Sequence, residues 1–262
     1  MFKKSFYAVV LAALAIAWTV GGTGCTSAPL AAVRPHVLQQ TSDKFPDRSR
    51  IDAVIFDMDG TLLDSLGAWE HASANYLRTR GIEMPAEMEK RLENMSLGEG
   101  AEYIKNAFNL PESPEDLLAA VVAPVRERYM TSIPAKPGVE QVLKYLKAQG
   151  IKIAVATAAD TELARGAFSR TGLLPYFDFM IDCNEVGIGK RSPAIYEETL
   201  KRLGTTKART LVVEDALYAL QTAKKAGFLT AGIADSHYDA AYETRVRNTG
   251  DYFFTSFTDS LK

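Results

Sequence analysis

Cysteine and histidine are both scarce in this chain of 262 residues, which contains two cysteines and three histidines. Two cysteines, Cys25 and Cys183, cannot build the disulfide framework of a small secreted domain. The sequence also lacks any cluster of cysteine and histidine at the spacing of a zinc site. Any metal ion in this protein must therefore be held by oxygen ligands.

An excess of charge of either sign is also missing. The chain has 30 Lys and Arg against 32 Asp and Glu, a formal net charge of -2. This balance gives no sign of a surface that binds polyanions, so no nucleic-acid partner is expected. With 47% hydrophobic and 24% charged residues, the composition excludes a disordered chain, a collagen-like repeat and a polytopic membrane protein.

The first 24 residues differ from the rest of the chain. Lys3 and Lys4 precede an almost wholly apolar run over 8–20, and small residues follow up to Cys25. This order is typical of a secretory signal. The apolar run is shorter than the roughly 18 residues expected of a membrane-spanning helix. An uncleaved anchor remains an alternative interpretation.

The residues around Cys25 refine this prediction. Gly22-Thr23-Gly24-Cys25 resembles a bacterial lipoprotein box, although Gly22 replaces the usual leucine. We therefore expect residues 1–24 to form a leader, Cys25 to carry a lipid, and residues 25–50 to form a tether. The expected location is an exported protein that meets a membrane only through its N-terminal lipid or anchor. Simple secretion, and a cytoplasmic protein with a misassigned start, are the alternatives.

Short apolar runs alternate with helical segments from residue 51 onward. Residues 53–56 are apolar and β-branched or aromatic, which is typical of a buried parallel strand. Helices are expected between such runs, because proline, glycine, serine and aspartate mark their ends. The alternation predicts an α/β fold with a doubly wound parallel sheet. The further strands are expected at 153–156, 177–181, 211–213 and 230–233, and the helices at 137–150, 160–172, 192–204 and up to 227.

The stretch 66–133 breaks this alternation because it contains no convincing strand. Four helices are expected there, at 66–80, 85–95, 97–108 and 114–130. Ser113 before Pro114 marks one helix start, and Pro124 should kink or divide that helix. The block follows the first strand directly, so it predicts an inserted, all-helical cap. The α/β core would then comprise 51–65 and 134–262.

Polar residues follow four of the predicted elements at the edge where ligands bind in open α/β sheets. Converging carboxylates repel one another, and Mg²⁺ is a natural counter-ion because it takes oxygen ligands and leaves positions for a phosphate. Gly60 would let the backbone turn after the first strand, with Thr61 as a hydroxyl donor beside it. The residues at this edge are Asp57, Asp59, Gly60, Thr61, Thr157, Lys190, Glu214 and Asp215.

The run Asp57-Met58-Asp59-Gly60-Thr61 resembles the first motif of the haloacid dehalogenase superfamily. Thr157, Lys190 and Glu214-Asp215 match its remaining motifs, so the resemblance covers about residues 51 to 262. The helical insert is similar to the cap of the β-phosphoglucomutase-like and sugar-phosphatase branch. The resemblance thus implies a haloacid dehalogenase-like core with a helical cap.

Roles for these residues follow from the resemblance. Asp57 would be the nucleophile that forms an aspartyl-phosphate, and Asp59 would act as general acid and then general base. Thr157 and Lys190 would bind the phosphoryl oxygens. Asp57, the backbone carbonyl of Asp59, and Asp215 with Glu214 nearby would hold Mg²⁺. These are the roles expected of a phosphoric monoester hydrolase.

The resemblance implies a Mg²⁺-dependent phosphatase whose partner is a small phosphorylated metabolite, such as a sugar phosphate. A phosphosugar mutase is the first alternative, since it would use both aspartates. β-Phosphoglucomutases typically carry a histidine where this chain has Trp69, and this difference favours hydrolysis. A surface lipoprotein that binds phosphorylated ligands without catalysis is the second alternative. It is disfavoured because every catalytic side chain is present.

Overall fold

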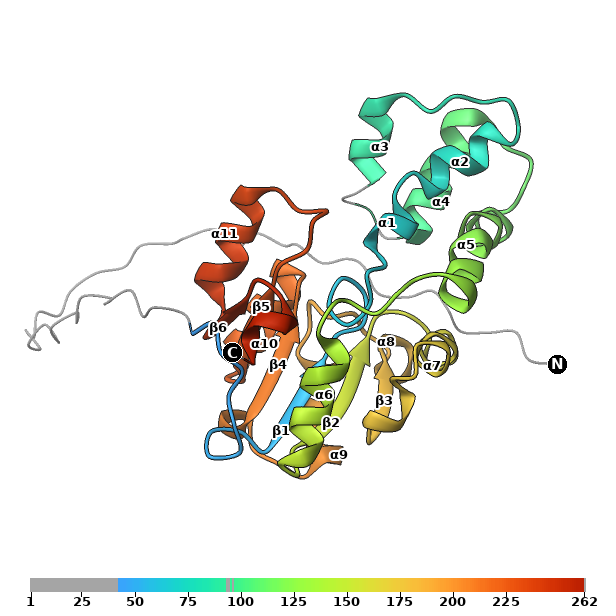
Figure 1. The fold of residues 1–262 in the computed structure, drawn as a ribbon. Helices are drawn as coiled ribbons and strands as arrows, with labels where there is room; N and C mark the ends of the chain where they lie inside the picture. The colour runs from blue at the N-terminus through green and yellow to red at the C-terminus, as the bar shows by residue number, and fades with distance from the viewer. Residues whose placement is uncertain (1–41, 93–94, 96, 262) are drawn as a thin grey trace, which may run out of the picture. The chain divides into compact units, whose positions relative to one another are not determined.

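The computed structural model describes residues 42–92, 95 and 97–261. The predicted leader and Cys25 lie outside these residues. A six-stranded, all-parallel sheet has the order β3-β2-β1-β4-β5-β6 (Figure 1), which confirms the doubly wound fold. The strands are β1 (Ala53–Phe56), β2 (Lys152–Thr157), β3 (Phe179–Asp182), β4 (Thr210–Glu214), β5 (Leu229–Ile233) and β6 (Tyr252–Phe254).

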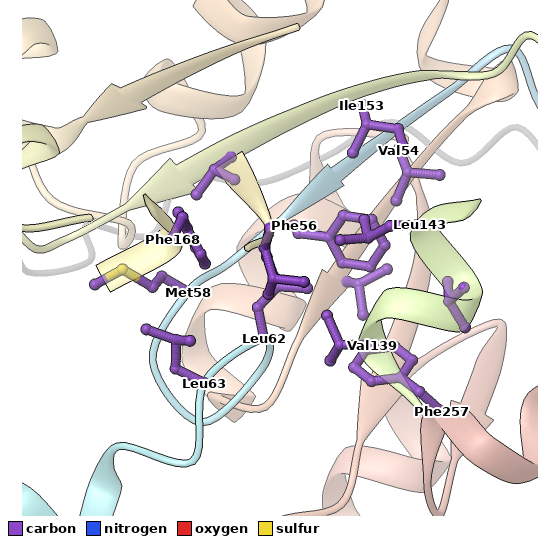
Figure 2. Close-up of a cluster of buried hydrophobic side chains, with 14 of the residues drawn as sticks. Val54, Phe56, Met58, Leu62, Leu63, Val139, Leu143, Ile153, Phe168 and Phe257 are labelled. Atoms are coloured by element: carbon purple, nitrogen blue, oxygen red, sulfur yellow. The ribbon is translucent and has the colours of Figure 1, made fainter. Parts of the chain in front are cut away.

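Helices cover the sheet, and alternate residues of β1 face different groups of them. Val54 and Phe56 belong to a cluster with side chains from 139–146, 163–168 and Phe257 (Figure 2). Ala53 and Ile55 belong to a second cluster with side chains from 195–203 and Ala223. Because both faces of β1 are buried, its sequence is a continuous apolar run. The core helices are α6 (Val139–Ala148), α7 (Thr161–Arg170), α8 (Cys183–Val186), α9 (Ala194–Leu203), α10 (Leu217–Lys225), α11 (Ala240–Thr249) and α12 (Phe257–Ser260).

The inserted block is helical, and part of it has its own hydrophobic cluster, which includes Leu77, Ile104 and Leu117. Ser113 caps the last helix, since its side chain accepts a hydrogen bond from the backbone N–H of Asp116 at 3.0 Å. The cap helices are α1 (Leu66–Trp69), α2 (Ala72–Arg78), α3 (Ala86–Leu92), α4 (Leu97–Phe108) and α5 (Pro114–Thr131). Among the described residues, no helix is both long and apolar enough to cross a membrane.

Several local details differ from the sequence predictions. The helix expected at 66–80 is two helices. His71 lies between them in the left-handed region with φ 58°, which interrupts the helical backbone hydrogen bonds. Pro124 does not divide α5, which continues to Thr131, so the kink expected there stays a prediction. A proline removes one backbone donor, and α5 has buried residues on both sides of that position, among them Val121 and Val125. The strand expected at 177–181 runs over 179–182, and β6 with α11 and α12 was missed.

The segment 42–50, expected to be part of the tether, packs on the core where it is described. Ser42 forms a bridge with Tyr252 of β6. Phe45 is 6% exposed, and its ring stacks on Phe254 with centroids 4.9 Å apart. Its backbone N–H donates to the carbonyl of Ser260 at 2.8 Å. Burial of a phenylalanine contributes about 1.5–3 kcal/mol, so this segment stabilises the core.

Candidate active site

Asp57 lies at the point where the sheet order reverses. It follows β1, which pairs with β2 on one side and β4 on the other. Its backbone N–H donates to the carbonyl of Val213 at 3.0 Å, which extends the ladder to β4. Such a switch point is where open α/β sheets bind ligands, at the carboxyl ends of the strands. The Asp57 side chain is buried there, with 9% of its surface exposed.

Lys190 joins two carboxylates at this edge. Its ammonium donates to Asp57 Oδ1 and, at 2.8 Å, to Glu214 Oε1. Burial alone would lower the pKa of Lys190, but Asp57 and Glu214 outweigh burial and raise that pKa. Lys190 is therefore a permanent positive charge inside the site, able to attract a phosphoryl group.

Asp215 is fixed by residues that approach from two sides. The Thr61 hydroxyl donates to Asp215 Oδ1 at 2.9 Å, and the Tyr238 hydroxyl donates to Oδ2 at 2.9 Å. Gly60 has φ 73°, and a Cβ at this position would lie 2.5 Å from Asp215 Oδ2. Only glycine fits both the turn and the close approach of this carboxylate. Gly60 thus allows the turn after β1, as expected from the sequence, and also leaves room for the Asp215 carboxylate.

Glu214 is 1% exposed and uses only one of its two carboxylate oxygens. Oε1 accepts hydrogen bonds from Lys190 and, at 2.7 Å, from the Tyr196 hydroxyl, whereas Oε2 is buried without a partner. Burial raises the pKa of Glu214, as it does that of Asp215, with Asp57 adding to both shifts. The three buried carboxyl groups Asp57, Glu214 and Asp215 thus lie close to one ammonium, that of Lys190, which contacts Asp57 and Glu214.

The same carboxylates fit a divalent cation. Asp57, Glu214 and Asp215 each offer a ligand oxygen, and these oxygens all lie within 4.8 Å of one another. An unpaired carboxylate oxygen and an excess of negative charge are both relieved by a hard cation with oxygen ligands. The donor set expected from the sequence therefore fits a metal such as Mg²⁺. The Asp59 side chain is not part of this group.

Asp59 accepts hydrogen bonds from hydroxyl groups that do not belong to the strands or the residues directly after them. Ser65, before α1, donates to Asp59 Oδ1 at 2.7 Å, and Tyr129 of α5 donates to the same oxygen. The Trp69 indole N–H in turn donates to the Tyr129 hydroxyl at 3.0 Å. Burial, reinforced by the charge of Asp57, raises the pKa of Asp59 to about 6. A carboxyl group with this pKa can hold and release a proton near neutral pH.

Thr157 is the last residue of β2, the strand that pairs with β1. It is fully buried, and its Oγ1 accepts the backbone N–H of Ala159 at 3.0 Å. This contact uses a lone pair of the hydroxyl and leaves its proton to be donated elsewhere. Its hydroxyl proton is therefore available to an anionic oxygen, and the phosphate-binding role of Thr157 stays a prediction.

A second group of potential ligands lies beside the linkers to the cap. Asp64, Asp235 and His237 could each offer an atom within 4.8 Å of the others. Asp235 is already paired, however, because Lys136 Nζ lies 2.7 Å from it and His237 Nδ1 lies 2.8 Å from it. Lys136 thus offsets the charge of Asp235, so this group is explained by an ion pair and does not require a metal ion.

The structure joins most of the predicted residues into one site. Hydrogen bonds join Lys190 to Asp57 and Glu214, and Thr61 to Asp215. Carboxylate oxygens of Asp57, Glu214 and Asp215 lie within 4.8 Å of one another, and Asp59 lies near enough for the Asp57 charge to raise its pKa. Sequence reasoning missed the hydroxyl groups that hold the carboxylates. Tyr238 could have been found, because it follows the end of β5 at the same edge of the sheet. The other missed residues are Ser65, Tyr129 and Tyr196.

The geometry agrees with a comparison of the sequence with known families. The model of haloacid dehalogenase-like hydrolases matches residues 51–227. The match spans more than half of the chain, so this protein belongs to the haloacid dehalogenase-like hydrolase family. The class expected from the sequence, a phosphoric monoester hydrolase of this family, is confirmed.

Individual relatives agree with this class. The chain is 31% identical over 183 residues to a phosphoglycolate phosphatase of Rhodobacter capsulatus, covering 67% of this chain and 80% of that protein. It is 29% identical over 177 residues to a phosphorylated carbohydrates phosphatase of Thermotoga maritima, covering 68% and 82% respectively. A solved Thermotoga maritima structure assigned as a β-phosphoglucomutase has a TM-score of 0.68 at 27% identity. That match covers 80% of this chain and 97% of the other.

Proposed function

We propose that this protein is a Mg²⁺-dependent phosphatase that hydrolyses a small phosphomonoester through an aspartyl-phosphate. The observation that carries the proposal is the position of Asp57. Its carboxylate lies at the switch point, in contact with Lys190 and within ligand distance of Glu214 and Asp215. A carboxylate nucleophile divides the hydrolysis into two displacements, each with a lower barrier than direct attack by water.

In the first displacement, a carboxylate oxygen of Asp57 attacks phosphorus and the bond from phosphorus to the leaving oxygen breaks. Asp59 gives its proton to that oxygen, so the alcohol leaves as a neutral molecule. Ser65 and Tyr129 both hold Oδ1 of Asp59, so we assign Oδ2 as the oxygen that carries the proton. Lys190 and Thr157 would hold the phosphoryl oxygens during transfer.

In the second displacement, the ionised Asp59 takes a proton from water. The water oxygen attacks the phosphorus of the aspartyl-phosphate, the bond from phosphorus to the Asp57 oxygen breaks, and phosphate leaves. Asp59 is thereby protonated again and ready for another cycle. When bound by Asp57, Glu214, Asp215 and the backbone carbonyl of Asp59, Mg²⁺ would offset the negative charge of these groups and of the phosphoryl group.

We propose a sugar phosphate or a similar small metabolite as the substrate. The named activities of the Thermotoga maritima and Rhodobacter capsulatus relatives support this substrate class. A phosphosugar mutase remains the alternative, since a mutase would use the same two aspartates. Trp69 favours hydrolysis, because its indole N–H is engaged by Tyr129 and an indole has no second nitrogen to accept a proton.

A panel of sugar phosphates tests the proposal. Wild-type protein with Mg²⁺ should release inorganic phosphate, and EDTA should abolish that release until Mg²⁺ is restored. Asp215→Ala should raise the Mg²⁺ concentration required. Nuclear magnetic resonance should show no interconversion of glucose 1-phosphate and glucose 6-phosphate. Isomerisation with little free phosphate would establish the mutase, and ligand binding without turnover would establish a binding protein.

We also propose that the protein is exported and carries a lipid on Cys25. The order of basic, apolar and small residues before Cys25 supports this location. A diacylated cysteine meets the two-chain requirement for lasting membrane attachment. Mass spectrometry of the native N-terminus should find a lipidated Cys25, and Cys25→Ala should remove the protein from the membrane fraction. An unmodified start in cytosolic protein would contradict both export and lipidation.

A further inference from the structure

Tyr196 is a fully buried tyrosine whose hydroxyl contacts a carboxylate of the candidate active site. It lies on α9, six residues after Lys190, and its ring packs against Phe228 with centroids 6.2 Å apart. The hydroxyl donates to Glu214 Oε1 at 2.7 Å. No sequence motif points to this residue, yet its only polar atom contacts a carboxylate of the proposed metal site.

The two oxygens of Glu214 differ sharply in their surroundings. Oε1 accepts two hydrogen bonds, one from Tyr196 and one from Lys190, while Oε2 is buried without a partner. Leaving a buried acceptor unpaired costs about 1–3 kcal/mol, and more when the group is charged. This arrangement would be costly unless a cation occupies the space that Oε2 faces.

We propose that Tyr196 is a positioning residue for the metal ion. By holding Oε1, it directs Oε2 of Glu214 to the cation that Asp57 and Asp215 would share. The inference rests on the proposed function, because it assigns a role within the same metal site. It adds a residue to that site and identifies which Glu214 oxygen is the ligand.

Lys190 cannot perform this task alone. Its ammonium already contacts Asp57 as well as Glu214, and it is the group that would turn toward the phosphoryl oxygens. A lysine side chain is long and flexible, whereas the Tyr196 ring is fixed by packing and offers a single donor. Tyr196 therefore keeps Glu214 in place when Lys190 engages the substrate.

Metal binding itself provides the test. Isothermal titration calorimetry with Mn²⁺ on the full-length protein compares wild type, Tyr196→Phe and Tyr176→Phe. Tyr176→Phe is a matched control, because the Tyr176 hydroxyl donates to an exposed glutamate, Glu140, at 3.1 Å. Loss of a group that orients a metal ligand typically weakens binding by about 10- to 100-fold. We expect about a 10-fold higher Kd for Tyr196→Phe and an unchanged Kd for Tyr176→Phe.

The outcomes separate this inference from the proposed function. If wild-type protein does not bind Mn²⁺, the proposed metal site itself is wrong. If wild type binds and folded Tyr196→Phe binds with the same Kd, the positioning role is overturned. The change should also have no further effect on Kd in a Glu214→Ala background. An equal loss in both backgrounds would indicate a general packing defect and would also overturn the role.

A spectroscopic measurement keeps Tyr196 intact, should Tyr196→Phe fail to fold. It uses a Tyr238→Phe background, because the Tyr238 hydroxyl contacts Asp215. Saturation with Mg²⁺ should change the ultraviolet absorption of tyrosine, since the carboxylate accepting its hydrogen bond becomes a metal ligand. Glu214→Ala should abolish that change. Tyrosine absorption that does not respond to Mg²⁺ would overturn the inference.

Discussion

The carboxylates of the site fall into two groups that are anchored by different parts of the molecule. The core group comprises Asp57, Glu214 and Asp215. Lys190 contacts the first two, and Thr61 donates to Asp215. Asp59 is held instead by Ser65, which precedes the first cap helix, and by Tyr129 of the last cap helix. The residues of the proposed metal site are thus held by the core, whereas Asp59, the proposed proton carrier, is held in part by the cap residue Tyr129.

The largest effect should come from the core group. Asp57→Asn removes the nucleophile while keeping the size of the side chain, so turnover should fall by about 10⁴- to 10⁶-fold. Phosphate release from p-nitrophenyl phosphate measures the loss, and a thermal melt checks that the variant folds. Wild-type activity in purified Asp57→Asn would contradict the proposed mechanism. Asp57 could then not be the nucleophile.

A smaller effect is expected for the proton carrier. Asp59→Asn should lower turnover by about 10²- to 10⁴-fold, because proton transfer is lost and the nucleophile remains. In the proposed mechanism Asp59 is protonated before the first displacement, and its pKa is raised to about 6. The kcat/KM of wild type should therefore fall as the pH rises through about 6.

The variant also provides the control for this pH dependence. The substrate phosphate titrates near pH 6 in the same way for both proteins, so only the difference between their profiles reports on Asp59. Identical pH profiles for wild type and Asp59→Asn would assign the proton carrier to another group.

Tyr129→Phe tests the difference between the two groups of carboxylates. It removes the hydrogen bond from the cap to Asp59 and changes no contact of the core group. A hydrogen bond to a charged group contributes about 1.5–3 kcal/mol, so we expect kcat to fall by about 10- to 100-fold. The Kd for Mn²⁺ should stay at the wild-type value, which calorimetry measures. A weaker affinity for Mn²⁺ would mean that the cap also shapes the metal site.

Trp69→Phe should have the smallest effect. The Trp69 indole N–H contacts the Tyr129 hydroxyl rather than Asp59 itself, so its loss should lower kcat by about 2- to 5-fold, corresponding to a neutral hydrogen bond of about 0.5–1 kcal/mol. Steady-state kinetics on the preferred sugar phosphate would measure this change. A loss as large as that of Asp59→Asn would show that Trp69 acts on the substrate directly.

Much of the core was predictable because its signals are local. The run at 53–56 is apolar on both faces, and Asp57 follows it at once, so the strand and its catalytic end appear together in the sequence. The short strand β6 was missed, since three residues carry too little pattern. The break at His71 was also missed, because histidine gives no strong signal for a left-handed conformation.

The sequence by itself determined which residues stand at the strand ends, because parallel strands bring their carboxyl ends to one edge of the sheet. Asp57 and Asp215 follow from that rule, because each comes directly after a strand, whereas Lys190 follows β3 only after the short helix α8. Only the tertiary structure decided which hydroxyl groups hold them. Tyr129 and Asp59 are 70 residues apart, and Tyr196 reaches Glu214 from another element. Such contacts depend on the rotation and packing of whole helices, which no local pattern of residues specifies.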